Sequence, residues 1–505
     1  MAIADYYSRS ALAASQVLSG FDEDRIRTVL CSASVGVAIG SDAARCNEGR
    51  TLLDLVVRLV ARLYPTLVIR GEVGAEEACD KARSLARAIN PNVEFESSPT
   101  VEIAIGSDLP AGSGWPQIFA GSGNWNAFVG TKHLQTLGNS DNPFGAGAAA
   151  CIAAANVFRL VFLGDQGLLD EDAVFSVLEN DSRESSDGTL PNSLGEIVLV
   201  GSGAIGNAAA WALSRLPIEG VLHLVDHQAV DLGNLQRYVM AERSHENINK
   251  AVVLARYFVG RIQAKQHVIK FEDFVATQGY TWPRMILALD SARDRRAAQA
   301  SLPQWIANAW TQPGDLGVSS HNFLDGACVS CLYLADHAVE NEDAIVASAL
   351  GIPNHLMQIR TLLHSGEGVP RNLLDAIVAG REIPIERLLP FEGRPIRNLY
   401  TEGFCGGAVI PMGELGTPRQ DVHVPLAHQS ALAGLLLAAA AVRQAGGPND
   451  CRTQVTRIDV MRPLGSHLTQ IAAKDQRGIC LCQDSDYRDA YQRKYATFVQ
   501  NLTKS

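Results

Sequence analysis

In the second half of the chain, short apolar runs alternate with segments of helical character. From Glu196 onward the order is strand, glycine turn, helix, strand, helix and strand. Strands that alternate with helices in this way form parallel sheets with helices on both faces. The pattern predicts an α/β protein that contains a parallel-rich sheet.

The first half of the chain echoes this pattern. Residues 142–162 and 424–444 are both rich in small residues and both read as helices. The longest apolar runs, at 144–162 and 431–442, fall within them. The first run is interrupted by polar residues and the second is too short to span a bilayer, so both predict buried helices. Alanine-rich core helices also resemble one another by chance, so an internal duplication stays open at this point.

A polar stretch at residues 181–193 separates the two halves and is typical of a linker. A chain of 505 residues is long enough for two or three domains. We expect one domain at 1–185 and a second at 194–505. Within the second, residues 336–404 show helical periodicity broken by prolines and glycines, which predicts a small helical insertion. The insertion could be a docking surface or a helical excursion without a role.

Charge and composition exclude several classes of protein. The formal net charge of −11 argues against a nucleic-acid partner, which needs a basic surface. The first residues lack a basic region followed by an apolar run, so we expect no secretory signal and a cytoplasmic location. Ten cysteines without such a signal favour reduced thiols, metal binding or catalysis over a disulfide framework.

A glycine turn followed by a spaced acid is the strongest motif in the chain. Gly201, Gly203 and Gly206 end an apolar run and open an alanine-rich helix, and Asp226 closes the next run 20 residues after Gly206. This is the dinucleotide fingerprint, in which glycines let the backbone approach phosphates and the acid binds a ribose hydroxyl. Alone it would suggest NAD. A further polar set, better suited to an ATP triphosphate and its metal, follows it: Asn234, Arg237, Lys250 and Asp290.

This combination resembles the ThiF/MoeB family, the adenylating enzymes that activate ubiquitin-like proteins and sulfur carriers. In that family the second strand ends in Asp, an Asn-x-x-Arg follows, a Lys lies about a turn into the next helix, and an Asp follows the fourth strand. Asp226, Asn234, Arg237, Lys250 and Asp290 match these positions in order. Tyr238 departs from the pattern, because the family usually has Gln there. The resemblance implies ATP and Mg²⁺ as cofactors.

The start of the chain is similar to the opening of the same family. The resemblance covers residues 7–41 and 112–162 and implies a second Rossmann-like adenylation domain. After its first strand, however, Asp42 stands where a glycine should approach phosphate, which implies that this domain has lost ATP binding. Family members act as pairs of such domains, and an arginine of one opening helix reaches the ATP of the other. Arg9 holds that position, although it could also be an ordinary surface arginine.

The resemblance assigns a role to each of these residues. A partner's C-terminal glycine carboxylate attacks the α-phosphate and expels pyrophosphate, a step that depends on positioning and charge neutralisation. The glycine turn and its helix N-terminus face the phosphates. The other implied roles are ribose binding by Asp226, phosphate contacts by Asn234, Arg237, Lys250 and Arg9, and magnesium coordination by Asp290. Arg295 also matches a family arginine.

Two cysteine pairs suggest a structural zinc ion. Cys328 and Cys331 form CVSC after an apolar run, and the family often pairs such a motif with a second one near the C-terminus. Here the second pair is Cys480 and Cys482, one residue shorter than usual. The resemblance implies a site of four thiolates, the donor set of structural Zn²⁺. The alternative is two unrelated pairs of buried thiols.

Cys405 lies in the glycine-rich stretch TEGFCGGAVIPMGELG. The family places its reactive cysteine in this crossover segment, where a thiolate attacks the acyl-adenylate and forms a thioester. A structural cysteine is the alternative, and some family members stop at the adenylate.

These features together predict two tandem Rossmann-like adenylation-type domains, the first degenerate, that pair within one chain or in a homodimer. The expected function is activation of a ubiquitin-like protein with a C-terminal glycine, which is handed to a separate conjugating enzyme. The chain is most similar to the activating enzymes of bacterial conjugation operons in antiphage defence (Bil/Bub type). The alternatives are a sulfur-carrier activator for thiamine or molybdopterin synthesis, a nicotinamide oxidoreductase and a non-catalytic scaffold.

Overall fold

The computed structural model describes residues 4–18, 23–109, 114–164, 168–185, 188–312, 315–334, 342–381, 383–404, 425–447, 454–465 and 467–502. The chain divides into two compact units. One comprises residues 1–10, 25–334 and 425–505; the other, which we call the helical unit, comprises 11–24 and 335–424. Cys405 lies outside the described residues, so the expectation for it stays a prediction.

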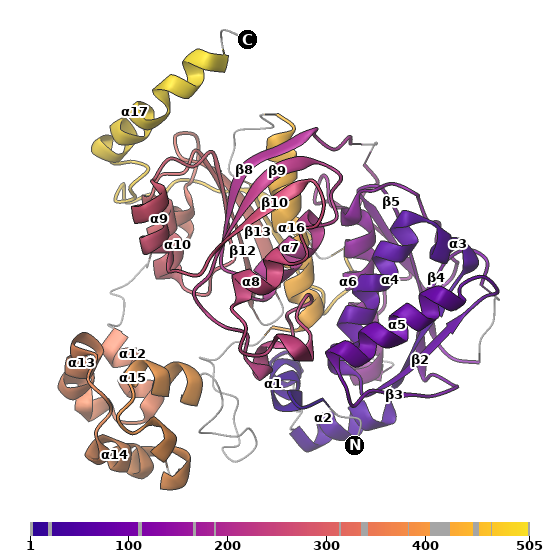
Figure 1. Cartoon of the computed structure of the whole chain (residues 1–505), viewed down its shortest axis with the longest axis horizontal. Helices are drawn as coiled ribbons and strands as arrows, with labels where there is room; N and C mark the ends of the chain where they lie inside the picture. The colour runs from indigo at the N-terminus through magenta and orange to yellow at the C-terminus, as the bar shows by residue number, and fades with distance from the viewer. Residues whose placement is uncertain are drawn as a thin grey trace. The chain divides into compact units, whose positions relative to one another are not determined.

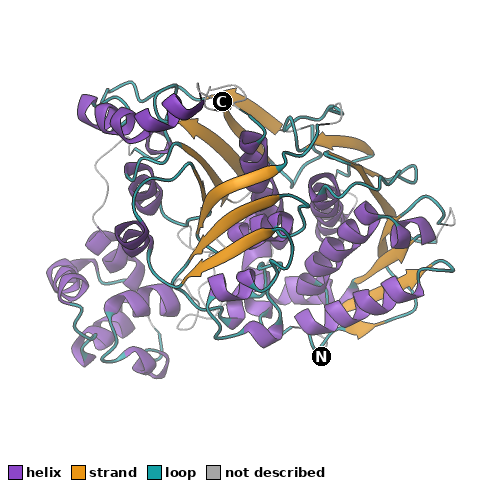
Figure 2. Ribbon diagram, turned by 45° about the horizontal axis from the view of Figure 1, so that its top comes forward, coloured by secondary structure: helices purple, strands orange, loops and turns teal. Residues whose placement is uncertain are grey.

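The first unit contains two sheets, one from each half of the chain (Figures 1 and 2). The N-terminal half, as we call residues 1–185, contains α1 (Tyr7–Val17), α2 (Glu23–Ser32), β1 (Ser34–Ile39), α3 (Ser41–Arg45), α4 (Asn47–Leu63), β2 (Thr66–Gly71), α5 (Glu76–Ile89), β3 (Glu94–Phe95), β4 (Val101–Ile105), β5 (Gln117–Gly123), β6 (Asn126–Gly130), α6 (Pro143–Leu163) and β7 (Asp172–Ser176).

The C-terminal half, residues 194–505, carries the second sheet. Its elements in the first unit are β8 (Ser193–Val200), α7 (Ala204–Leu213), β9 (Glu219–Val225), η2 (Leu232–Asn234), η3 (Arg243–His245), α8 (Lys250–Ala255), β10 (Ile262–His267), α9 (Phe271–Gln278), β11 (Arg284–Leu287), α10 (Ala292–Ala300), β12 (Trp305–Gln312), β13 (Asp315–Asn322), α11 (Val329–Leu332), α16 (Ala427–Ala445), β14 (Gln454–Ile458), β15 (His467–Ile471) and α17 (Ser485–Leu502).

The two sheets share one topology. Their strand orders are β3-β2-β1-β4-β5-β6-β7 and β10-β9-β8-β11-β12-β13-β14-β15. In both, the strands up to the fifth are parallel and the next two pair antiparallel. The predicted α/β class with parallel-rich sheets is confirmed, and the shared strand order supports the internal duplication.

Four helices from the two halves pack together at the junction of the sheets: α4, α6, α7 and α16. Small residues allow this close approach. A Cβ on Gly434 would lie 2.3 Å from the Ile205 carbonyl oxygen, and one on Gly147 would lie 2.9 Å from side-chain atoms of Leu435 and Trp211. By length and composition α6 could cross a membrane, but 83% of its apolar window is buried inside the fold. The two apolar runs are therefore buried core helices, as predicted.

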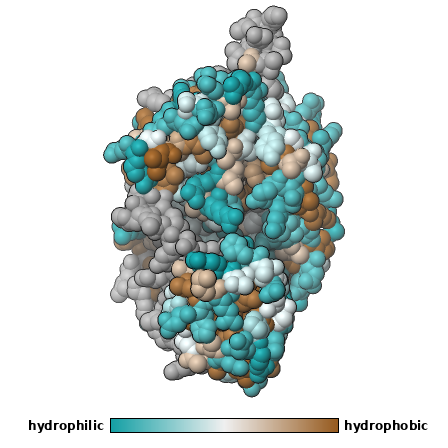
Figure 3. All heavy atoms as spheres, turned by 90° about the vertical axis from the view of Figure 1, so that its left-hand side faces the viewer, coloured by the Kyte–Doolittle hydropathy of each residue, from teal (hydrophilic) through white to brown (hydrophobic). Residues whose placement is uncertain are grey.

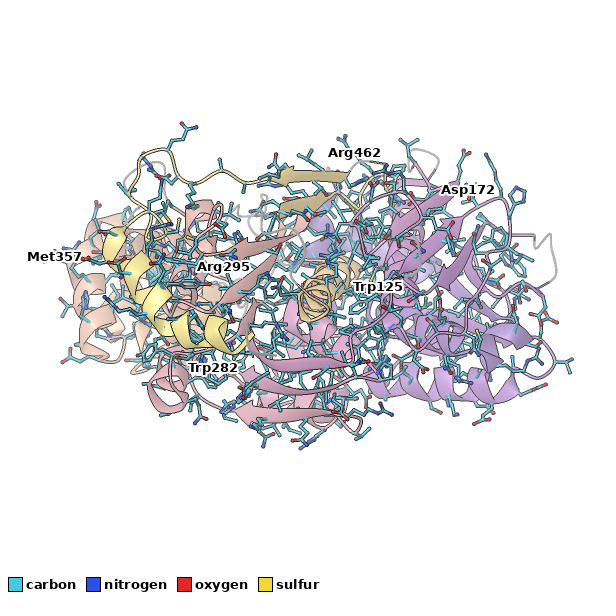
Figure 4. The ribbon with its side chains drawn as sticks, turned by 90° about the horizontal axis from the view of Figure 1, so that it is seen from above. Trp125, Asp172, Trp282, Arg295, Met357 and Arg462 are labelled. Atoms are coloured by element: carbon cyan, nitrogen blue, oxygen red, sulfur yellow. The ribbon has the colours of Figure 1, made fainter. Side chains whose placement is uncertain are left out.

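The described part of the presumed linker packs against the N-terminal half. The Trp125 indole N–H donates to the Gly188 carbonyl at 2.7 Å, and Asn126 exchanges hydrogen bonds with Ser185. Trp125, which is labelled in Figure 4, also stacks on Phe144 of α6, with ring centroids 4.8 Å apart. The polar composition of this stretch reflects backbone and side-chain hydrogen bonding rather than a free tether.

The helical unit has a hydrophobic core of its own. Its described elements are α12 (Glu342–Leu350), η4 (Pro353–His355), α13 (Leu356–Ser365), α14 (Arg371–Arg381), η5 (Ile385–Arg387), η6 (Leu389–Phe391), α15 (Ile396–Asn398) and the π-helical turn η7 (Leu399–Phe404). Side chains without exposed area in this core are Leu350, Ile359, Leu373, Leu374, Ile377, Leu388, Ile396 and Leu399. Each stabilises the unit by roughly 1.5–3 kcal/mol. Figure 3 shows hydrophilic and hydrophobic residues interspersed on the visible surface.

Candidate functional site

The glycine turn between β8 and α7 needs its glycines for steric reasons. Gly201 has φ +92°, and a Cβ there would lie 2.4 Å from the Ala288 carbonyl oxygen. A Cβ on Gly206 would lie 2.1 Å from the Gly201 carbonyl oxygen. Gly203 caps α7 without a side-chain hydrogen bond, and the nearest atom to a Cβ there is the Tyr238 hydroxyl, 3.6 Å away. The turn therefore presents a helix N-terminus, which favours anions.

Asp226 follows β9 and clamps this turn. Its two carboxylate oxygens accept the backbone N–H groups of Ser202 and Gln228, each at 2.8 Å. Asp226 is 9% exposed, so the carboxylate is oriented by its surroundings before any ligand binds. Charge-assisted hydrogen bonds of this kind are each worth about 1.5–3 kcal/mol.

Lys250 is the first residue of α8, rather than a turn into the helix as the family pattern implied. The residue is 6% exposed, its ammonium donates to Gln228 Oε1 at 2.8 Å, and it lies 5.3 Å from the centre of the Tyr238 ring. Burial lowers the pKa of Lys250, but the electrostatic influence of Tyr238, Asp226 and Asp290 outweighs this and leaves the pKa raised. Lys250 therefore supplies a fixed positive charge beside the turn.

The Asn-x-x-Arg segment lies next to Lys250. Asn234 shares a capping box with Asp231: its Oδ1 accepts the Asp231 N–H at 3.2 Å, and its own N–H donates to the Asp231 carboxylate at 3.0 Å. The Arg237 guanidinium is half-exposed and sits 5.7 Å from the Tyr238 ring centre. Tyr238, which replaces the usual Gln, is thus flanked by two cations.

Arg9 reaches this segment from the opening helix of the other half. Its Cγ and Nε lie 3.3 Å from the position that a Cβ on Gly233 would occupy. Gly233 lies within η2, directly before Asn234. The structure therefore brings Arg9 of α1 to the same place as Asn234, as the expected internal pairing requires.

Asp290 and Arg295 differ in whether their side chains are available to a ligand. Asp290 follows β11 and is exposed, while its charge still raises the pKa of Lys250. Arg295, which is labelled in Figure 4, is 6% exposed and donates to Asn308 Oδ1 at 2.7 Å and to the Ala309 carbonyl at 3.3 Å. Arg295 is therefore committed to strand β12, whereas Asp290 remains available to a cation.

Two arginines of α4 were not identified from the sequence as part of the site. Arg62 donates to the carbonyls of Leu235, Val239 and Ala241, and Arg58 donates to the Val239 carbonyl. These carbonyls continue the Asn-x-x-Arg segment. No local motif marks such arginines, because their partners lie more than 170 residues away along the chain.

The four expected zinc ligands converge. The Sγ atoms of Cys328, Cys331, Cys480 and Cys482 all lie within 4.8 Å of one another. Cys328 Sγ is 3.4 Å from Cys480 Sγ, and Cys331 Sγ is 3.5 Å from Cys482 Sγ. A tetrahedral ion with Zn–S bonds of about 2.3 Å separates its sulfurs by roughly 3.8 Å, so the donors fit Zn²⁺. The shorter Cys-x-Cys spacing does not prevent convergence.

The equivalent turn of the N-terminal half is closed by carboxylates. Asp42 accepts the Ala43 N–H at 2.7 Å and the Ser107 N–H at 2.9 Å. Asp108 accepts the Ser41 N–H at 3.0 Å with both oxygens. Two negative charges thus occupy the turn and its backbone donors, which disfavours a phosphate on electrostatic grounds.

Three cysteines of the N-terminal half do not have the properties of activated nucleophiles. Burial raises the pKa of Cys46, Cys79 and Cys151. Asp42 and Glu48 also raise the pKa of Cys46, although it accepts the Gly49 N–H at the start of α4. A reactive cysteine needs a lowered pKa, because the thiolate is the nucleophile.

Comparison with known proteins identifies relatives of both halves. Residues 186–476 match the ThiF family, and residues 38–163 match the family described as Prokaryotic E2 family C. The sequence alone had given no sign of a conjugating-enzyme segment. Over its whole length the chain is 40% identical to the uncharacterized protein y4jF of Sinorhizobium fredii, 99% of which is covered.

Solved structures with lower similarity include two Escherichia coli proteins. MccB with ATP is 13% identical, with a TM-score of 0.35 over 57% of this chain and 66% of the MccB chain. The tRNA N6-threonylcarbamoyladenosine dehydratase TcdA, in complex with ATP, is 27% identical, with a TM-score of 0.20 over 21% of this chain and 45% of its own. The family assignment rests on the sequence match, which covers more than half of the chain. The chain belongs to the ThiF family of E1-like, ATP-using adenylating enzymes.

Proposed function

We propose that this protein activates a ubiquitin-like protein by adenylating its C-terminal glycine, and then carries the acyl group as a thioester on Cys405. The observation that carries the adenylation step is the convergence of the clamped glycine turn, the buried Lys250 and Arg9 of the other half. A dinucleotide site explains the turn and Asp226, but gives no reason for these cations.

Each of the site residues has a role that follows from its charge. The turn and the N-terminus of α7 bind phosphate oxygens, and Asp226 binds the ribose. Lys250, Arg237 and Arg9 neutralise charge that accumulates as pyrophosphate leaves. Magnesium supplies further neutralisation of the triphosphate, and exposed Asp290 is the carboxylate that would hold it. Attack by the partner's carboxylate then needs correct placement rather than a catalytic base.

Both family matches support a partner of the ubiquitin type. The C-terminal half matches an activating family, and the N-terminal half matches a family described as a prokaryotic E2. The raised pKa values of three thiols in the N-terminal half favour a separate conjugating enzyme over transfer within this chain. A bacterial ubiquitin-like conjugation operon in antiphage defence is the context we propose.

Zinc is proposed to have a structural role. The four thiols join α11 to the segment that precedes α17. Helix α17 itself packs on the same half, and its Tyr495 hydroxyl donates to the Trp282 and Leu302 carbonyls. A closed four-thiolate site leaves no open position for a substrate, so it contributes folding free energy rather than chemistry.

The test mixes the protein with ATP, magnesium and a candidate ubiquitin-like protein ending in glycine. Partner-dependent exchange of pyrophosphate into ATP measures adenylation, and a thiol-sensitive adduct on non-reducing gels measures the thioester. Wild type should show both, and Cys405→Ala should lose the adduct while keeping the exchange. Cys31→Ala is the control, because Cys31 is exposed but lies in the other half.

Three other outcomes would change the proposal. Exchange without an adduct would indicate sulfur-carrier chemistry or direct transfer. Binding of NAD in preference to ATP would indicate an oxidoreductase. ATP binding with no exchange toward any glycine-ended partner, unchanged by Asp290→Ala, would indicate a scaffold.

A further inference from the structure

The N-terminal half contacts the proposed ATP site through buried guanidiniums of α4, and Arg62 makes most of these contacts. Arg62 of α4 is 1% exposed and donates to three backbone carbonyls of the other half. The distances are 2.6 Å to Leu235, 2.9 Å to Val239 and 2.7 Å to Ala241. All three acceptors lie in residues 234–241, the segment that starts with Asn234 and contains Arg237 and Tyr238.

This segment satisfies only some of its own carbonyls: the Asn234 carbonyl accepts the Arg237 and Tyr238 N–H groups, and the Tyr238 carbonyl accepts the Ala241 N–H. It runs from η2 toward η3 without forming a regular helix or strand, so its carbonyls lack the ladder partners that such elements provide. Within its own half, the Met240 N–H donates to Asn207 Oδ1, the Tyr257 hydroxyl donates to the Met240 carbonyl, and the Gln236 side-chain amide donates to the Pro425 carbonyl. The carbonyls of Leu235, Val239 and Ala241 accept instead from α4, through Arg62 and through Arg58, whose Nη1 lies 3.0 Å from the Val239 oxygen.

The charges around the two arginines differ. Arg58 pairs with Asp54 at 2.9 Å, and the same carboxylate accepts Arg215 at 2.6 Å and the Trp211 indole at 2.7 Å. Arg62 makes no ion pair among the described residues, and burial lowers its pKa to about 10. A buried cation without a carboxylate is costly, so its hydrogen bonds to the segment need to be good. Arginine suits this role, because its planar fork carries five donors.

The geometry points to Arg62 as a positioning residue through which the N-terminal half fixes residues 234–241 in the shape that contacts ATP. The claim that residues 234–241 contact ATP rests on the proposed function, whereas the claim that Arg62 orders these residues does not. It gives the half that has lost its own nucleotide site a function in the site of the other half. Arg62 touches neither nucleotide nor substrate, and acts through the backbone around Arg237.

The chain offers a matched control in the opposite direction. Arg443 of α16 donates to the Val177 and Leu178 carbonyls of the N-terminal half, so it also joins the two halves through backbone carbonyls. Its acceptors lie after β7, outside residues 234–241. Loss of Arg443 removes a junction contact without removing support from the segment.

The experiment compares Arg62→Met, Arg62→Lys and Arg443→Met in the full chain. Two quantities are measured: amide hydrogen exchange of residues 234–241, and the Kd of ATP·Mg²⁺ by calorimetry. Arg62→Met should accelerate exchange in the segment and weaken ATP at least tenfold, equivalent to about 1.4 kcal/mol. Arg443→Met should change neither quantity, even if both variants lose similar stability. Arg62→Lys should lie between, because an ammonium keeps the charge but cannot span three carbonyls.

Equal effects of Arg62→Met and Arg443→Met would overturn the inference and leave a general docking role. Unchanged exchange of residues 234–241 in both Arg62 variants would also overturn it. If Arg62→Met does not fold, the comparison of Arg62→Lys with Arg443→Met is judged by the same two measurements, the exchange of residues 234–241 and the Kd of ATP. Failure of wild type to bind ATP would defeat the proposed function, while the exchange measurement would still decide whether Arg62 orders the segment.

Discussion

The two halves of this molecule have the same strand order, but the turn after the first strand is open in the C-terminal half and occupied by carboxylates in the N-terminal half. In the C-terminal half, the Ser202 N–H is held by Asp226, the acid after the second strand of that half, and the turn is left open at Gly203. In the N-terminal half, the Ser41 N–H is held by Asp108, three residues beyond β4, and Asp42 replaces the open glycine. Changing which acid binds the turn converts an anion site into a closed structural corner.

The two halves therefore contribute in different ways to the same proposed site. The C-terminal half keeps the open turn and Lys250, and the N-terminal half keeps the helices that support the partner's site, with Arg9 and Arg62 reaching across. The predictions below separate these two kinds of contribution.

The largest expected effect concerns zinc, because among the described residues only the C-terminal half has such a thiol cluster. Binding of a structural zinc ion is worth on the order of 10 kcal/mol. Cys480→Ser or a strong chelator should release one zinc ion per chain, measured by elemental analysis, and should destabilise the C-terminal half. Hydrogen exchange should rise in α17 and around α11 while β1–β4 stay protected. Full protection of α17 after zinc loss would show that the cluster is dispensable.

Next in size is Asp226→Ala, which removes the carboxylate that orients both Ser202 and Gln228. Loss of two charge-assisted hydrogen bonds should weaken ATP by at least a hundredfold, about 2.7 kcal/mol. The matched control is Glu72→Ala. Ile39 pairs with Gly71 as Val200 pairs with Val225, so Glu72 occupies the equivalent place in the N-terminal half. Calorimetric titration with ATP·Mg²⁺ measures the affinity of both variants for ATP. If the Glu72 variant binds ATP as weakly as the Asp226 variant, the proposed difference between the two halves is refuted.

Acid should affect the halves unequally. Of the 12 histidines only His133 lies in the N-terminal half, whereas burial lowers the pKa of His428 in α16 to about 3, with a further lowering from Arg159. Its folded pKa lies below the unfolded value near 6.5, so its contribution to stability is complete above pH 6.5 and is lost as pH falls. At pH 5 the loss is about 2 kcal/mol. Thermal unfolding from pH 7 to pH 5 should show this slope, and His428→Gln should reduce it, leaving the part due to His321, whose pKa burial lowers to about 4. An unchanged slope in the variant would assign the acid sensitivity to other groups.

The features that could be predicted from the sequence are those marked by residues at fixed short spacings. Glycines, the acid 20 residues later and the cysteine pairs are short-range patterns, and the structure brings each set together. Lys250 was placed a turn too deep in α8, because helix starts depend on caps such as Asn249, whose side chain accepts two helical N–H groups. Arg62 was missed, since its three acceptors are set by how the halves pack and a lone arginine within an amphipathic helix carries no signal of that. The family resemblance pointed to Arg9 as a residue that reaches across, whereas Arg58 and Arg62 were found only in the structure.

The smallest expected effect tests the closed turn itself. Asp42→Ala removes the acceptor of the Ala43 and Ser107 N–H groups and should destabilise the N-terminal half by about 1–2 kcal/mol, measured by urea denaturation. The variant should not gain ATP binding, because Asp108 still occupies the Ser41 N–H and no buried lysine equivalent to Lys250 follows β2 among the described residues. Asp80→Ala is the control, since Asp80 is exposed and pairs only with Arg83, so its loss should stay within about 0.5 kcal/mol. A second ATP per chain in the Asp42 variant would mean that the Asp42 carboxylate alone closes this turn to a nucleotide.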